Sequence, residues 1–93
     1  MLVALKKVHV SFITADGVSI GRATESAIFL DDVTVSRTHA QINREESGSF
    51  VLIDNSSLNG TYLNNISVEK NVLKSGDEIQ IGKFHFVFIG SSK

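Results

Sequence analysis

Hydrophobic and polar residues alternate in short runs along most of this chain. The alternation is present in residues 8–12, 18–20, 40–43, 61–63, 78–81 and 84–88, with turn-forming pairs such as Asp16-Gly17 and Gly82-Lys83 between runs. Residues 28–30 are also strand-like, and residues 50–53 are a continuous apolar run, which is typical of a strand covered on both faces. No segment keeps a helical apolar period over three turns. The pattern therefore predicts an all-β sandwich or barrel of many short antiparallel strands.

The composition supports a small β-rich domain. Val, Ile, Phe, Thr and Tyr, which favour strands, make up one third of the 93 residues. A chain of this length forms one domain, which we expect to span residues 1–90. Residues 91–93 follow Gly90 with the sequence Ser-Ser-Lys and are expected to be a tail or the edge of a linker.

Composition and charge also exclude several classes of protein. The chain has no cysteine, so it is neither a disulfide scaffold nor a thiolate zinc protein. No apolar stretch approaches the ~20 residues that span a bilayer, and the N-terminus lacks the layout of a signal peptide, so we expect no membrane insertion and a cytoplasmic location. The net charge of −1 argues against electrostatic binding of nucleic acid, although a local phosphate pocket needs only a few cations.

The candidate chemistry lies in polar connections between the predicted strands. Gly21-Arg22, residues 36–39 (Ser-Arg-Thr-His) and residues 57–61 (Ser-Leu-Asn-Gly-Thr), followed by Asn64, supply two guanidinium groups, hydroxyls and amides. A guanidinium fork and a hydroxyl donor suit phosphate oxygens, and an amide suits the backbone of an extended peptide. Taken alone, these residues indicate an anion site beside a peptide clamp. The alternative is that both arginines are solvated loop charges and residues 59–60 are only a turn.

The same elements give the chain a family resemblance. It resembles the forkhead-associated (FHA) domain, a phosphothreonine-binding β-sandwich, in the order and spacing of Gly21-Arg22, residues 28–32, residues 36–40, residues 57–61, Gly76-Asp77 and Ile81-Gly82. The resemblance runs from Met1 to about Ile89. Within the family, the chain is similar to small actinobacterial FHA proteins that act downstream of Ser/Thr protein kinases and regulate 2-oxoglutarate metabolism.

The resemblance implies a fold and an extent. The fold is an all-β sandwich of two antiparallel or mixed sheets with about 10–11 short strands and the binding loops at one end. The actinobacterial regulators carry a phosphorylatable threonine tail ahead of this domain. Because the first strand is expected to begin within a residue or two of Met1, we expect that tail to lie outside this sequence.

The resemblance also implies binding roles for particular residues. Arg22 matches the arginine that contacts the phosphate, and Ser36 matches the serine whose hydroxyl donates to it. Arg37 is at a position where several members add a phosphate contact. Asn59 matches the asparagine that hydrogen-bonds the backbone of the bound peptide.

One position departs from part of the family. Some members have a Thr before that asparagine that helps to hold the phosphothreonine, whereas this chain has Leu58, and Ser57 is the expected substitute. The positions expected to support the site structurally, with His39 linking one binding loop to another through its ring nitrogens, are Gly21, His39, Gly60, Thr61 and Asn64.

Two catalytic or metal-binding interpretations are weaker. Ser36, His39 and Asp54 have the residue types of a hydrolase triad, but the chain has no strand–nucleophile–helix elbow. The three histidines have no metal-ligand spacing, and His9 and His85 are expected to face solvent on strands.

Three other sequence features have simpler structural explanations. Gly82-Lys83 has no preceding P-loop glycine and is expected to be a hairpin turn. Phe84, Phe86 and Phe88 are expected to be core residues of a terminal strand, not a platform for stacking bases. Asp31-Asp32 is expected to be a solvated turn, not a calcium site.

The sequence therefore predicts a domain that binds phosphothreonine peptides and performs no catalysis. Its expected partners are threonine-phosphorylated proteins or peptides and a Ser/Thr protein kinase, with no nucleic acid, metal or cofactor. The alternative is a scaffold of the same fold that docks proteins independently of phosphate. The presence of Arg22, Ser36 and Asn59 together counts against that alternative.

Overall fold

The computed structural model describes residues 2–4, 10–11 and 17–90, and these residues form strands and turns without a helix. The eleven strands are β1 (Leu2–Ala4), β2 (Val10–Ser11), β3 (Val18–Gly21), β4 (Ile28–Phe29), β5 (Ala40–Arg44), β6 (Phe50–Asp54), β7 (Thr61–Leu63), β8 (Ile66–Val68), β9 (Lys70–Val72), β10 (Glu78–Ile81) and β11 (Phe84–Phe88). In the described residues, no helix is long and apolar enough to cross a membrane.

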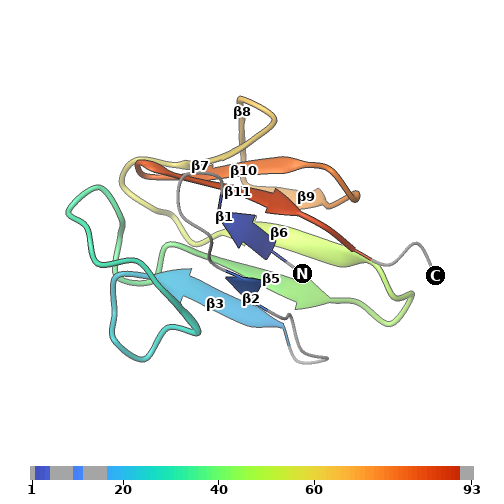
Figure 1. Ribbon diagram of the computed structural model, residues 1–93, viewed down its shortest axis with the longest axis horizontal. Helices are drawn as coiled ribbons and strands as arrows, with labels where there is room; N and C mark the ends of the chain where they lie inside the picture. The colour runs from blue at the N-terminus through green and yellow to red at the C-terminus, as the bar shows by residue number, and fades with distance from the viewer. Residues whose placement is uncertain (1, 5–9, 12–16, 91–93) are drawn as a thin grey trace.

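The strands form two sheets (Figure 1). A six-stranded antiparallel sheet has the order β2-β1-β11-β10-β7-β8, and a five-stranded sheet has the order β4-β3-β5-β6-β9. The five-stranded sheet is mixed because β3 pairs in parallel with β4 and antiparallel with β5. These observations confirm the prediction of a sandwich of antiparallel and mixed sheets with about 10–11 short strands.

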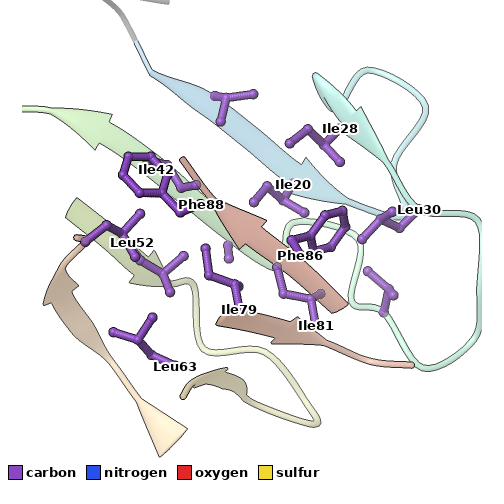
Figure 2. Packing of buried hydrophobic residues seen from close by; sticks show 14 residues of the cluster. Ile20, Ile28, Leu30, Ile42, Leu52, Leu63, Ile79, Ile81, Phe86 and Phe88 are labelled. Atoms are coloured by element: carbon purple, nitrogen blue, oxygen red, sulfur yellow. The ribbon is translucent and has the colours of Figure 1, made fainter. Parts of the chain in front are cut away.

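The core lies between the two sheets (Figure 2). Ile20, Ile42 and Leu52 from the five-stranded sheet pack against Ile79 and Phe86 from the six-stranded sheet, and each is at most 1% exposed. In β5, β10 and β11 these core residues alternate with half-buried neighbours, which places one face of each strand in the core, as the period-2 pattern requires. The prediction that the terminal strand supplies core is confirmed, since Phe86 and Phe88 are buried and Phe84 packs against them in part.

The continuous apolar run in β6 is covered on both faces at its centre. Leu52 belongs to the core cluster, whereas its neighbour Val51 is on the opposite face and is also buried. This confirms the prediction for the middle of the run, and Phe50 and Ile53 at its ends are only half-buried.

The sequence pattern did not reveal β8 and β9. Ile66 in β8 and Val72 in β9 are exposed, so neither strand shows an alternation of buried and exposed positions. Both are edge strands that are defined by backbone pairing, β8 with β7 and β9 with β6. Hydrophobic periodicity cannot find a strand that buries little of its side-chain surface.

Three connections gather at one end of the sandwich, the left end in Figure 1. They are the first loop (residues 22–27, between β3 and β4), the second loop (residues 30–39, between β4 and β5) and the third loop (residues 55–60, between β6 and β7). The β5–β6 hairpin turn is at the opposite end. The fold thus brings the three sequence elements with candidate chemistry to one place.

Some predictions concern residues that the structure does not describe. The alternation of residues 8–12 is described only at Val10–Ser11, and the predicted turn before β3 only at Gly17. His9, which was predicted to face solvent, and the predicted tail 91–93 lie outside the described residues.

Candidate functional site

Backbone hydrogen bonds join the first loop to the second. The amide of Arg22 donates to the carbonyl of Ser36 at 3.0 Å, and the amide of Ala23 donates to the carbonyl of Arg37 at 3.1 Å. At Gly21 the two segments come so close that a Cβ atom would overlap the carbonyl oxygen of Arg37. Glycine is therefore required at position 21 for Arg22 and Ser36 to lie side by side.

The Arg22 side chain is partly anchored. Its Nε donates to the carbonyl oxygen of Val35 at 3.0 Å, and the side chain is half-buried. Among the described residues, neither terminal nitrogen of this guanidinium has a partner, and Arg22 makes no ion pair. One nitrogen thus holds the guanidinium, and the described residues do not engage its two terminal nitrogens.

Arg37 differs from Arg22 in its setting. Arg37 is exposed, and its side chain has no hydrogen bond or ion pair with the other described residues. It lies next to Ser36 on the second loop.

His39 links the second and third loops. It is fully buried, and its Nδ1 accepts a hydrogen bond from the backbone amide of Ser36 at 3.0 Å. Its Nε2 is 2.8 Å from the carbonyl oxygen of Gly60. Since an amide can only donate and a carbonyl can only accept, these partners assign the proton to Nε2 and leave the ring neutral.

Ser36 and Asn59 add two further links between these loops. The backbone amide of Leu58 donates to Oγ of Ser36 at 3.0 Å, which leaves the Ser36 hydroxyl proton available to an anion. Nδ2 of Asn59 donates to the carbonyl of Thr34 at 3.0 Å, so the Asn59 amide oxygen remains available to a backbone N–H. The Leu58 side chain is 88% exposed, so this residue contributes to the link through its backbone.

Asp54 organises the third loop from the end of β6. Its carboxylate accepts hydrogen bonds from the Ser57 amide at 3.1 Å, from the Ser57 hydroxyl and from the Thr61 hydroxyl at 2.7 Å. Burial raises the pKa of Asp54, but the hydrogen bonds from Ser57 and Thr61 outweigh it, and the net shift is downward. The sequence predicted Ser57 as a phosphate ligand, whereas in this structure its hydroxyl proton points to Asp54.

A second aspartate stabilises the second loop. Asp32 accepts hydrogen bonds from the amide and hydroxyl of Thr34 and forms a 3.1 Å ion pair with Nζ of Lys83 in the β10–β11 turn. The hydrogen bonds from Thr34, followed by the one from Lys83, lower the pKa of Asp32 from 3.8 to about 2. The sequence predicted a solvated turn here and missed the contact with Lys83.

The described residues contain no group of three or more His, Cys, Asp or Glu side chains that could hold a metal ion.

The depressed pKa of Asp32 leads to a prediction about stability. A carboxylate whose pKa is lower in the folded state stabilises the fold above its ordinary pKa, and this contribution is lost as the pH falls through the folded value. For Asp32 the loss is expected as the pH falls from 3.8 to about 2. Urea unfolding across this range should show Asp32→Asn losing less stability on acidification than the parent.

Asp31→Asn is the matched control, because Asp31 is the exposed neighbour of Asp32. If the two variants respond identically to acid, the contacts of Asp32 do not contribute to the pH dependence. The stability of Asp32→Asn should still fall somewhat with pH, because the pKa of Asp54 is also lowered in the folded state.

Gly60 and Asn64 are placed differently from each other. Gly60 has a φ of +84°, which favours glycine, and its carbonyl accepts from His39. Asn64 is at the other end of β7, where its side chain contacts Asp77 and the amide of Glu78. Asn64 and Asn65 both have positive φ and form the two-residue turn between β7 and β8, so the structure does not bring Asn64 into the loop cluster.

The hydrolase triad is not assembled. His39 Nδ1 accepts a hydrogen bond from the backbone amide of Ser36, not from its hydroxyl, and His39 Nε2 bonds the carbonyl of Gly60. The carboxylate of Asp54 accepts hydrogen bonds from Ser57 and Thr61.

His85, which was predicted to face solvent, is half-buried and pairs with Glu78 at 3.1 Å, so it does not face solvent fully.

Comparisons with known proteins agree on one family. A family model described as the FHA domain matches residues 18–82. The chain is 61% identical over 69 residues to the oxoglutarate dehydrogenase inhibitor of Corynebacterium diphtheriae, covering 74% of this chain and 48% of that protein. It is 56% identical over 75 residues to the glycogen accumulation regulator GarA of Mycolicibacterium smegmatis, covering 81% of this chain and 47% of that protein. The chain thus spans about half the length of these curated relatives.

Solved structures agree at the level of the fold. One, from a structural and functional analysis of phosphothreonine-dependent FHA domain interactions, superposes with a TM-score of 0.91 at 27% identity, covering 99% of this chain and 96% of that chain. Another, Mycobacterium tuberculosis EmbR in complex with a low-affinity phosphopeptide, gives a TM-score of 0.89 at 28% identity, covering 99% of this chain and 25% of that chain.

Proposed function

Because the chain belongs to the FHA domain family, we propose that it binds phosphothreonine peptides in Ser/Thr kinase signalling and carries out no catalytic step. The observation that carries this proposal is the arrangement of Arg22 and Ser36. Backbone bonding between the first and second loops places them side by side, with two terminal guanidinium nitrogens and a hydroxyl proton that have no partner among the described residues.

The proposed mechanism is recognition of charge supplemented by backbone contacts. A phosphothreonine carries about −1.5 to −2 charge at pH 7 and three acceptor oxygens. Donation from Arg22, Ser36 and Arg37, at about 1.5–3 kcal/mol each, gives a gross gain of about 5–9 kcal/mol. Association costs at least about 4 kcal/mol of rigid-body freedom, so the phosphate alone gives weak binding. The Asn59 amide then supplies further affinity by bonding the peptide backbone.

The relatives support a regulatory role, which we propose takes place in the cytoplasm. One is named an inhibitor of oxoglutarate dehydrogenase and another a regulator of glycogen accumulation. We infer that this domain binds threonine-phosphorylated proteins, with a Ser/Thr kinase as a further partner.

Ser57 would donate a hydrogen bond to the phosphate only if its hydroxyl turned away from Asp54.

A titration with paired peptides tests the proposed function. A library of threonine-phosphorylated peptides and their unphosphorylated counterparts is titrated against the protein. We expect binding only to phosphorylated members. Equal binding of both forms would instead favour the phosphate-independent scaffold.

The charge-based mechanism predicts a pH dependence. The second ionisation of a phosphothreonine has a pKa of about 6, and two arginines beside a hydroxyl favour the dianion. Affinity is therefore expected to fall as the pH drops from about 7.5 to about 5.5. Isothermal titration across this range measures the effect, with circular dichroism to verify the fold at each pH. A constant affinity would contradict the proposed role of the phosphate charge.

A further inference from the structure

We propose that Asp54 is a positioning residue for the phosphopeptide site, one that holds the third loop in the shape that presents Leu58 and Asn59 to the second loop. The inference rests on the proposed function and extends it to a residue that lies behind the binding surface.

The first observation is how Asp54 closes the third loop. Its carboxylate accepts from the amide and hydroxyl of Ser57, three residues ahead, and from the hydroxyl of Thr61, at the first residue of β7. One side chain thereby joins the end of β6, the middle of the loop and the start of β7. Thr61 is fully buried, so the closure is anchored in the sandwich.

The backbone of the loop is consistent with this closure. Ser56 has a φ of +57° and Gly60 a φ of +84°, which are left-handed conformations. A non-glycine residue in this conformation costs free energy and persists where neighbouring contacts hold it. The two hydrogen bonds that Ser57 donates to Asp54 come directly after Ser56 in the chain and supply such contacts.

The second observation is what the closed loop presents. Three bonds leave it toward the second loop: the Leu58 amide to Ser36 Oγ, the Asn59 side chain to the Thr34 carbonyl, and the Gly60 carbonyl to the His39 ring. The first of these fixes the orientation of the Ser36 hydroxyl. Among the described residues, the Asp54 carboxylate makes no hydrogen bond to the second loop, so we attribute its influence on the site mainly to Ser57 and the loop backbone.

Replacing Asp54 by asparagine tests the inference. The amide keeps the shape of the side chain but offers only one acceptor oxygen, so it cannot satisfy all three donors. We expect the Kd for a phosphothreonine peptide to rise at least about tenfold, the loss typical of a charge-assisted hydrogen bond. In the ligand-free protein, we expect faster hydrogen exchange at the Leu58 amide, because its bond to Ser36 is loosened.

Asp77→Asn is the matched control. Asp77 also accepts from a backbone amide, that of Lys74, and from a side-chain amide, that of Asn64, but it lies at the other end of β7. It is expected to lose stability without a change in Kd or in Leu58 exchange. If both aspartate variants weaken binding equally, Asp54 acts only on global stability and the inference is wrong.

Ser57→Ala keeps the test decisive if Asp54→Asn does not fold. This variant removes one donor to Asp54 and should raise Leu58 exchange in the absence of ligand, which a residue acting only on bound phosphate would not do. Where Asp54→Asn does fold, the effects of Asp54→Asn and Ser57→Ala on Kd should be non-additive in a double-mutant cycle.

The outcomes separate this inference from the proposed function. If the parent binds no phosphopeptide, the proposed function fails, and Leu58 exchange still reports whether Asp54 shapes the loop. If the parent binds and Asp54→Asn binds equally well with unchanged Leu58 exchange, the positioning role is overturned while the function stands.

Discussion

Replacing Arg22 by alanine is expected to weaken binding of a phosphothreonine peptide by about 1.5–3 kcal/mol, which is roughly tenfold to over a hundredfold. The guanidinium is held by its Nε at the Val35 carbonyl, so its terminal nitrogens are oriented before the ligand arrives. A pre-oriented donor loses less entropy on binding than a solvated one. The loss of that single bond should lower the free energy of unfolding by only about 1 kcal/mol.

Two further variants make the Arg22 result interpretable. Arg44→Ala removes an exposed arginine from β5, near the opposite end of the sandwich, and should bind like the parent. Arg22→Lys keeps the charge but loses the fork and the Nε donor, so it should recover only part of the affinity. Peptide titrations beside thermal melts provide the measurement. If Arg22→Ala binds the phosphopeptide like the parent, Arg22 is a solvated charge and the site is wrongly assigned.

The sequence predicted those parts of the fold that depend on local pattern. Strands such as β5 and β10 alternate apolar and polar positions because one face is buried, and their bounds could be placed closely. The edge strands β8 and β9 could not, because their pairing leaves the side chains largely exposed. The convergence of the three loops at one end followed from the family resemblance and not from periodicity.

The groups proposed to bind the ligand were predictable from the sequence, and so were the supports Gly21 and His39, whereas the parts played by the two aspartates that hold the loops were not. Arg22, Ser36 and Asn59 have residue types that suit a phosphopeptide, and they lie on adjoining loops. Asp32 is different, since its role depends on Lys83, which is far along the chain and meets it only in the folded sandwich. Its local sequence is equally compatible with a solvated turn, so no sequence signal separates the two.

Asn64 and Ser57 are residues that the sequence assigned to the site but that have other partners in the structure. Asn64 follows the loop motif closely in sequence, but three residues of β7 carry it to the other end of the strand. The pair Asn64-Asn65 is instead a signal for a two-residue hairpin turn, since asparagine tolerates positive φ. At Ser57 the residue type was compatible with a phosphate ligand, and the competing acceptor, Asp54, was visible in the sequence only as a possible triad member.

Replacing His39 by alanine is expected to destabilise the fold by about 1–3 kcal/mol, in contrast to the small effect at Arg22. The ring is fully buried, and its removal leaves the Ser36 amide and the Gly60 carbonyl without their partner and opens a cavity. Phosphopeptide affinity should also fall at temperatures where the variant is fully folded, because the second and third loops are then joined without the His39 ring and Ser36 is held less firmly, through the Leu58 amide.

The matched control for His39 is His85→Ala. His85 is half-buried on the outer face of the six-stranded sheet and has Glu78 as its partner, so its loss should change stability little and affinity not at all. Melting curves and titrations of both variants separate the two histidines. If His39→Ala melts like the parent, the buried ring does not hold the loops together.

Because Nδ1 of His39 must accept from an amide while its Nε2 donates to a carbonyl, no residue without both groups in one rigid ring can bridge the loops in the same way. His39→Gln, which has a donor and an acceptor on a flexible chain, should therefore restore only part of the stability.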